Sequence, residues 1–250
     1  WGDLYSTDIG SQPNTLAIGD FNKDGRLDIV VSNPGSDTIG LFLGYDSKPF
    51  ANVKLGRTGN GSRPHSVAIG DFNNDGISDI AIANYGNNNV GIYLGLDNAF
   101  SDNMLIYSTG VDSGPYFVAV EDLNNDNHSD IVVANFKSDN IAILLGYGNA
   151  TFAPAVTYLT GDRSHPFAVA IADFDNDNVL DIAVANSGTS TVLLLYGNGN
   201  GSFRNEESYQ LGYDYRPYSI AVTDLNQDGF MDIVIACYGT DNVEILLKRC

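Results

Sequence analysis

The stretch Asp20–Asp28 reads DFNKDGRLD, and it recurs along the whole chain. The equivalents are DFNNDGISD from Asp71, DLNNDNHSD from Asp122, DFDNDNVLD from Asp173 and DLNQDGFMD from Asp224. Each copy begins 51 residues after the copy before it. A fixed period of this length is typical of propellers, solenoids and other repeat architectures, so this stretch decides the fold.

Short apolar runs surround every copy. One run precedes it, as in LAIG at 16–19, and two follow it, as in IVVSN at 29–33 and IGLFLG at 39–44. A weaker fourth run ends the unit. The runs are rich in β-branched residues and too short for helices, and turn residues separate them. Four antiparallel strands per unit, repeated around an axis, predict an all-β fold, a five-bladed β-propeller that forms a single domain over residues 1–250.

The two ends of the chain suggest how such a ring would close. A fourth-strand pattern occurs at about residues 4–7, and the chain ends just after a third-strand pattern at 243–247. We therefore expect the N-terminal strand to complete the last blade and close the ring. The alternative is that the chain is part of a six- or seven-bladed ring.

Charge and cysteine content exclude several classes of protein. The 250 residues include 31 acidic and only 12 basic side chains, for a net charge of −19. A nucleic-acid binder that relies on a basic face is therefore excluded, and no apolar run is long enough for membrane insertion. We expect a monomer. Cys237 and Cys250 lie at opposite ends of a predicted strand, too far apart for a disulfide.

The repeated nonapeptide predicts a metal loop. Its pattern is D-x-[ND]-x-D-[GN]-x-x-D. Side-chain oxygens at positions 1, 3, 5 and 9, with a backbone carbonyl at position 7, suit Ca²⁺, which takes six to eight oxygen ligands. Position 6 should turn the chain with a positive φ, which glycine adopts freely and asparagine tolerates.

An ordinary β-turn is the alternative interpretation of these clusters. Five clusters of three or four carboxylates would repel themselves without a cation, so we favour about five Ca²⁺ ions, one per blade. The loops are 20–28, 71–79, 122–130, 173–181 and 224–232. The predicted ligands are Asp20, Asn22, Asp24, Arg26, Asp28, Asp71, Asn73, Asp75, Ile77, Asp79, Asp122, Asn124, Asp126, His128, Asp130, Asp173, Asp175, Asp177, Val179, Asp181, Asp224, Asn226, Asp228, Phe230 and Asp232.

These residues carry a resemblance to a known family. The segment DFNKDGRLDIVVSN from Asp20, with the P-x-x-x-A-[IV] run upstream of it, resembles the FG-GAP (or VCBS) repeat of integrin α-subunit propellers and related secreted proteins. The match covers essentially the whole chain, and the metal loop is its specific part. The resemblance implies that the loops join the first and second strands on one face. Integrin-like members have seven blades, so the functions of their opposite face are not carried over.

A second group of residues is predicted on the face opposite the metal loops. It combines aromatic rings with basic side chains, which is typical of carbohydrate or peptide recognition. The group is Arg63, His65, Tyr85, Tyr116, Phe136, Phe167, Tyr218 and Tyr238. Alternatively, these rings pack between the blades. The favoured function is an extracellular or cell-surface, calcium-stabilised binding or adhesion module for a glycan or an extracellular protein, with a lectin as its sharpest version.

Two other functions stay open. A propeller glycosidase would need a pair of carboxylates in the central channel. Glu121 is the one acidic residue of a predicted innermost strand outside the metal loops, and one carboxylate is not a pair. We therefore expect no enzyme activity. The last possibility is a purely structural repeat domain of a larger secreted protein.

Overall fold

The computed structural model describes residues 4–45, 50, 53–96 and 99–248. Every regular element within these ranges is a β-strand, as the short β-branched runs predict. We call each sheet built from one repeat a blade. The strands are, in blade 1, β1 Leu16–Gly19, β2 Asp28–Asn33, β3 Thr38–Phe42 and β4 Lys54–Arg57; in blade 2, β5 Pro64–Gly70, β6 Asp79–Asn84, β7 Asn89–Tyr93 and β10 Leu105–Ser108; in blade 3, β11 Pro115–Glu121, β12 Asp130–Asn135, β13 Asn140–Leu144 and β14 Val156–Leu159; in blade 4, β15 Pro166–Ala172, β16 Asp181–Asn186, β17 Thr191–Gly197 and β18 Phe203–Gln210; and in blade 5, β19 Pro217–Thr223, β20 Asp232–Cys237 and β21 Asn242–Leu246.

The strands of each blade pair in chain order from the inner strand outwards, and every pairing is antiparallel. Blade 2 also carries a small hairpin of β8 (Gly95–Leu96) and β9 (Ala99–Phe100). Blades 1 to 4 therefore have the predicted four strands, whereas blade 5 has three within the described residues.

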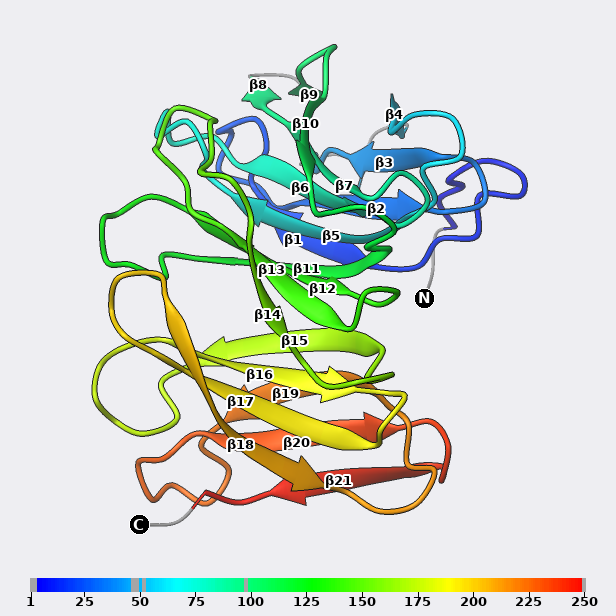
Figure 1. Cartoon of the computed structure of the whole chain (residues 1–250). Helices are drawn as coiled ribbons and strands as arrows, with labels where there is room; N and C mark the ends of the chain where they lie inside the picture. Colours follow the sequence, from blue (N-terminus) through cyan, green and yellow to red (C-terminus); the bar gives the residue numbers. More distant parts are fainter. Residues whose placement is uncertain (1–3, 46–49, 51–52, 97–98, 249–250) are drawn as a thin grey trace.

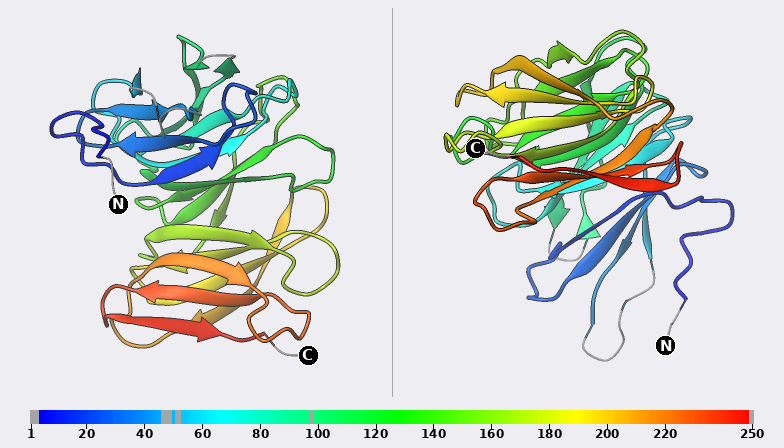
Figure 2. Two further views of the ribbon diagram at one scale, coloured as in Figure 1. Left: turned by 180° about the vertical axis from the view of Figure 1, so that it is seen from behind. Right: turned by 90° about the horizontal axis from the view of Figure 1, so that it is seen from below.

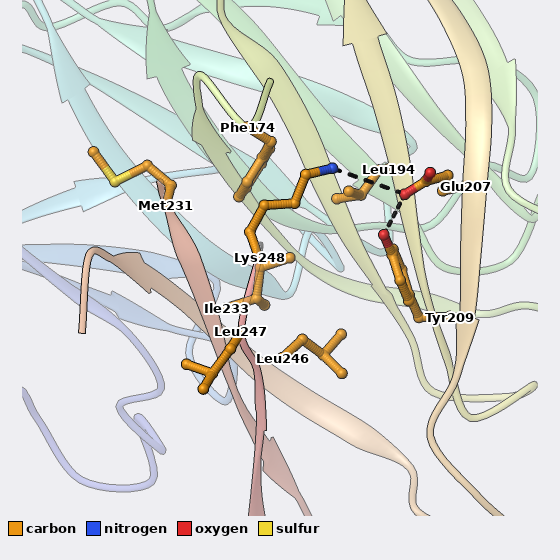
Figure 3. Close-up of a pocket in the computed structure, with 9 residues that line it drawn as sticks. All are labelled: Phe174, Leu194, Glu207, Tyr209, Met231, Ile233, Leu246, Leu247 and Lys248. Atoms are coloured by element: carbon orange, nitrogen blue, oxygen red, sulfur yellow. Dashed lines mark hydrogen bonds and ion pairs between the residues drawn. The ribbon is translucent and has the colours of Figure 1, made fainter. Parts of the chain in front are cut away.

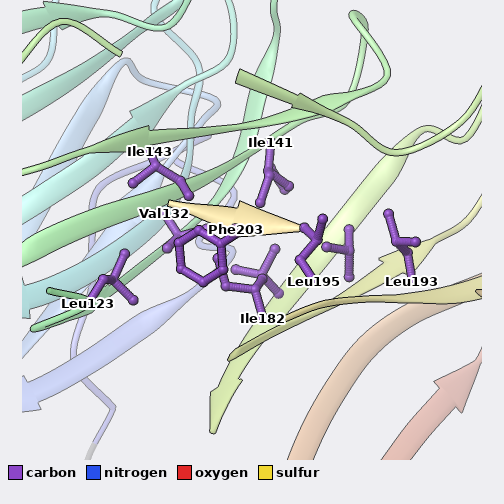
Figure 4. Packing of buried hydrophobic residues seen from close by; sticks show 11 residues of the cluster. Leu123, Val132, Ile141, Ile143, Ile182, Leu193, Leu195 and Phe203 are labelled. Atoms are coloured by element: carbon purple, nitrogen blue, oxygen red, sulfur yellow. The ribbon is translucent and has the colours of Figure 1, made fainter. Parts of the chain in front are cut away.

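The blades succeed one another along an arc (Figure 1). The inner strands β1, β5, β11, β15 and β19 contact each other in this order. The apolar core lies between adjacent blades, in four clusters. One of them joins Val132 and Ile143 of blade 3 to Ile182, Leu195 and Phe203 of blade 4 (Figure 4). Because each sheet buries a face against the next, the repeat forms one continuous series of interfaces.

The predicted closure of a five-bladed ring is wrong for this structure. Residues 4–7 form no strand, and among the described residues β21 pairs only with β20. Blades 1 and 5 lie at opposite ends of the arc (Figure 2). Val243 of β21 is 62% exposed, whereas its equivalent in blade 4, Val192, is fully buried. The outer face of blade 5 is therefore not covered by blade 1.

The physical reason is the rotation from one blade to the next. Counting residues predicts a fourth strand at residues 4–7 that could be shared, but it says nothing about that rotation. The side chains between the sheets set it, among them Phe21 and Phe72, which are almost wholly buried. The four rotations that relate the five blades leave an open arc, which is compatible with the alternative of a larger ring. Figure 2 shows blades 1 and 5 apart at its two ends.

The structure also bears on the predictions about the two cysteines and about membrane insertion. Cys237 is buried and free, and Cys250 lies outside the described residues, so their lack of pairing stays a prediction. Among the residues that the structure describes, no helix is long and apolar enough to span a membrane.

Candidate metal loops and ligand face

Each metal loop joins the inner strand of a blade to its second strand, and it turns through two left-handed residues. Position 6 has a positive φ, as predicted, with 79° at Gly25 and 63° at Asn127. Position 4 has one too, from 55° at Lys23 to 61° at Asn176, which the sequence reasoning missed. Asparagine occupies this position in three of the five loops. Because asparagine tolerates a positive φ, this pattern could have predicted the second left-handed residue.

Backbone N–H groups hold the carboxylates of positions 1 and 5 inside each loop. In the second loop, Asp71 Oδ1 accepts the Asp75 N–H (3.1 Å) and Asp71 Oδ2 accepts the Gly76 N–H (2.7 Å). Asp75 Oδ1 accepts the N–H of Ile77 at position 7 (2.7 Å). The other four loops repeat these bonds. Backbone N–H groups thus gather the acidic side chains within each loop.

The fourth loop gathers three carboxylates most closely. Asp173, Asp175 and Asp177 each offer an oxygen within 4.8 Å of the others. Two oxygens that bind one Ca²⁺ at 2.3–2.6 Å can lie up to about 5 Å apart, so this set fits a calcium ion. Burial first, and then the charge of Asp177, raise the pKa of Asp175 above its ordinary value. A bound cation would relieve this repulsion.

The carboxylate at position 9 has a second role that the sequence did not reveal. Asp79 is fully buried, and it accepts the Phe72 N–H at Oδ2 (2.8 Å) and the Gly95 N–H at Oδ1 (2.7 Å). It therefore ties the metal loop to the end of the third strand. Burial is the main cause that raises the pKa of Asp79 to about 6; the two N–H donors oppose the rise, and Asp75 and Asp71 add to it.

The same arrangement occurs in the other blades. The equivalents of Asp79 are Asp28, Asp130, Asp181 and Asp232, and each accepts two backbone N–H groups. Burial is again the main cause that raises the pKa of Asp130 to about 6.

Neighbouring loops also contact each other. Lys23 Nζ donates to the carbonyl of Asp75, and Asn176 Nδ2 donates to the carbonyl of Gly229 (3.0 Å). The first loop has one further feature: the guanidinium of Arg26 pairs with Asp24 and donates to the carbonyl of Gly44 (3.1 Å). The predicted ligation by the carbonyl of Arg26, and by its equivalents at position 7, stays a prediction.

The predicted ligand face lies at the other end of the strands. Four inner strands have a register irregularity just after their first residue, a proline, as between Pro64 and Ser66. The irregularity leaves one residue of each strand outside the regular pairing, and such bulges re-aim a side chain. These residues are His65, Tyr116, Phe167 and Tyr218.

The four rings contact one another in turn along the strand ends; two of the pairs are stacked, and Tyr116 and Phe167 are tilted by 44°. Ring centroids are 4.3 Å apart for His65 and Tyr116, 4.2 Å for Tyr116 and Phe167, and 4.1 Å for Phe167 and Tyr218. Tyr238 extends the stack at 4.7 Å from Tyr218, with the ring planes 5° apart. We call these five residues the aromatic ladder. The structure thus brings the predicted aromatic residues together, and much of their ring surface is used in contacts with each other.

The remaining predicted residues flank the ladder. Tyr85 and Phe136, from the turns between second and third strands, lie beside Tyr116 at 6.0 and 5.7 Å. Arg63 and His65 line a cavity of about 600 Å³ at blades 1 and 2. Burial first, and then the charge of Arg63, lower the pKa of His65, so its imidazole is neutral at pH 7.

The ladder is most open at blade 5. Tyr238 is 64% exposed and Tyr218 is 37% exposed. Next to them is a polar cavity of about 470 Å³, lined by Gln210, Asp214 and Arg216 among others. The carbonyl of Arg216 accepts the Tyr238 N–H (3.1 Å), which connects the cavity to the ladder.

Glu121 ends the inner strand of blade 3, where it pairs in register with Asp130. Burial first, and then the charge of Asp122, raise its pKa. These two acidic neighbours, Asp122 and Asp130, belong to the adjacent metal loop.

Comparisons with known proteins agree with the repeat. A model of the FG-GAP-like repeat matches residues 20–82, 71–133, 122–184 and 179–235. The human T-cell immunomodulatory protein is 30% identical over 200 residues, which are 75% of this chain and 32% of that protein. The chain therefore spans about a third of the length of this relative.

Solved structures share the fold. A virginiamycin B lyase from Staphylococcus aureus aligns with a TM-score of 0.65 at 14% identity, over 96% of this chain and 71% of the lyase. An Agrocybe aegerita lectin that recognises non-reducing terminal N-acetylglucosamine aligns with a TM-score of 0.59 at 20% identity, over 93% of this chain and 65% of the lectin. Such likeness shows the β-propeller fold alone, because one fold hosts many functions. The 51-residue repeat and the matched family model together show that this chain belongs to the FG-GAP-like repeat family.

Proposed function

We propose that this protein is a calcium-stabilised extracellular binding module whose ligand face is the aromatic ladder with its flanking cavities. The observation that carries the calcium proposal is the repeated network of the five loops. In each loop, backbone N–H groups orient the carboxylates of positions 1 and 5. The aspartate of position 9 is buried and accepts a further backbone N–H of the same loop. Oxygen-only donors in this number suit Ca²⁺.

The role of the cation would be structural. Asp79 and its equivalents already connect the metal loop to the third strand. An ion bound beside them would therefore stabilise the end of each blade that carries the metal loop. Removing it would leave several carboxylates close together in a partly buried place. The proposed need for calcium also favours an extracellular compartment, where the ion is abundant.

Calorimetric titration of the calcium-free protein with Ca²⁺ tests this proposal. We expect about five ions per chain and a rise of the melting temperature. Mg²⁺ is the control, because it keeps its water shell more firmly and should produce a much smaller rise. Absence of stoichiometric binding, or a melting temperature indifferent to Ca²⁺, would contradict the proposal.

The binding role rests on the exposed end of the ladder. Tyr218 and Tyr238 present nearly parallel rings, and the polar cavity beside them offers the amide of Gln210 and the charges of Asp214 and Arg216. Aromatic faces beside hydrogen-bonding groups suit a sugar ring, so a glycan is the ligand class we favour.

A glycan array probed in Ca²⁺ tests the ligand class. We expect binding that Tyr238→Ala abolishes, and Tyr147→Ala is the control, because Tyr147 is an exposed tyrosine at the other end of the strands. Unchanged glycan binding by Tyr238→Ala would place recognition elsewhere. Absence of glycan binding together with capture of an extracellular protein would favour protein adhesion instead.

A further inference from the structure

An aromatic side chain closes each of the first three interfaces between blades, near the metal loops. Phe203, at the start of β18, packs among Leu123, Ile143, Ile182 and Leu195 (Figure 4). Its ring also meets that of Tyr158 edge-on, at 5.9 Å. The ring of a fourth-strand hairpin in blade 4 thus fills a socket formed by blades 3 and 4.

The same socket occurs one interface earlier in the chain. Phe152 packs with Phe72, Ile92, Ile131 and Leu144. It also meets Tyr107 at 4.9 Å, as Phe203 meets Tyr158. Phe100 occupies the corresponding place between blades 1 and 2. The first three interfaces therefore use one device: an aromatic ring from the hairpin before the fourth strand enters a socket of apolar residues.

At the fourth interface the socket is an open pocket. Its volume is about 270 Å³. Figure 3 shows the side chains that line it. Its lining residues stand 51 positions after those around Phe203: Phe174, Leu194, Tyr209, Met231, Ile233 and Leu246 correspond to Leu123, Ile143, Tyr158, Leu180, Ile182 and Leu195. Among the described residues, no aromatic side chain of blade 5 enters this pocket.

Like the pocket, the outer edge of blade 5 has no partner among the described residues. β21 has no fourth strand beside it within the described residues, whereas β17, its equivalent, pairs with β18. An unpaired edge offers N–H and C=O groups to an added strand. The pocket and the edge are adjacent, because Leu246 lies at the end of β21 and Leu247 and Lys248 continue from it along the pocket.

We propose that the free edge of β21 and this pocket together bind a β-strand of the same repeat type, which inserts an aromatic side chain between Phe174, Tyr209 and Ile233. The three filled sockets specify the partner: an extended segment with Phe at the start of the strand, as in β18. Lys248 at the pocket rim donates to Tyr196 Oη (3.0 Å) and lies 4.0 Å from Glu207, so the rim is polar and the floor is apolar.

A peptide that copies residues 201–212, and so includes Phe203, is the probe. We expect saturable NMR shifts of the amides of 242–248 at up to millimolar peptide, and protection of β21 amides from hydrogen exchange. A peptide carrying Phe203→Ala should bind at least about tenfold more weakly, because the pocket would stay unfilled.

Two variants of the 250-residue chain keep the test specific. Leu247→Asp changes an exposed residue that lines the pocket, and should weaken peptide binding about tenfold or more. Leu159→Asp, at an exposed position on the outer strand β14, is the matched control and should bind as the native chain does.

Three results would overturn the proposal. They are the absence of saturable shifts, equal affinity for the peptide that lacks Phe203, and shifts that map to a different edge. Concentration-dependent dimerisation that blocks the β21 edge would also overturn it, because a second copy would then be the occupant. The calcium proposal is tested independently, since peptide binding is measured at constant Ca²⁺.

Discussion

The open arc predicts that one substitution has very different costs at two equivalent positions. Val192 of β17 and Val243 of β21 are 51 residues apart and occupy the same place in successive repeats. Val192 is fully buried between blades 4 and 5, whereas Val243 is 62% exposed. Replacing each by alanine removes the same two methyl groups from two different environments.

The magnitudes follow from burial. Two buried methyl groups contribute about 1.6 kcal/mol by transfer from water, and the cavity left behind adds to this. With the lower strand propensity of alanine included, Val192→Ala should lower the free energy of unfolding by about 3 kcal/mol. Val243→Ala should lower it by at most about 1 kcal/mol, because the strand propensity is nearly its whole effect.

Urea unfolding followed by far-UV circular dichroism measures both changes, at constant Ca²⁺ and low protein concentration. Equal m-values for the native chain and both variants are needed for the comparison, because a repeat protein can lose its cooperativity. Comparable losses in the two variants would refute the open arc, since they would show that Val243 is covered in solution.

Three further predictions concern the metal loops, the turns between second and third strands, and the aromatic ladder. Asp173→Ala should reduce the calcium bound per chain by about one ion, measured by elemental analysis after desalting, and an undiminished calcium content would contradict the assignment of this loop. Gly86→Ala should cost about 1–3 kcal/mol of unfolding free energy in urea, because a Cβ at Gly86 would lie 1.9 Å from the carbonyl oxygen of Gly61; a stability equal to that of the native chain would show that the turn can move. Finally, the lowered pKa of His65 means that the folded chain resists its protonation, so its contribution to stability is complete above about pH 6.5 and is lost as the pH falls below that value. His65→Asn should therefore have a smaller fall in melting temperature between about pH 7.5 and about pH 5 than the native chain, and equal falls would count against the buried neutral imidazole.

Much of the architecture could be predicted from local pattern. The runs at 16–19 and 29–33 became β1 and part of β2, because short β-branched segments between turns have few other solutions. The left-handed residue at position 6 followed from Gly25 and its equivalents. The clustering of the aromatic ladder followed from placing one aromatic residue at the same position of successive repeats.

The sequence could not show which contacts the polar and aromatic side chains prefer. The Asp at position 9 looked like a metal ligand only, and the structure shows both of its oxygens accepting backbone N–H groups from two separate segments. The sequence left open whether the rings of Phe167 and Tyr218 face a ligand or pack, and in the structure they stack on each other with planes 7° apart. Each contact joins residues that are distant in sequence, so no local pattern records it.

The amino-acid order alone determined the repeat, the strands and the acidic loops, because each depends on neighbours within about 51 residues. Tertiary structure decided the rotation between blades, and with it the open ends, the exposed face of β21 and the pocket beside Tyr209. That rotation is set by how side chains from two sheets fill the space between them. A small angle at each interface adds up along the arc, and the sum decides whether the first and last blades meet.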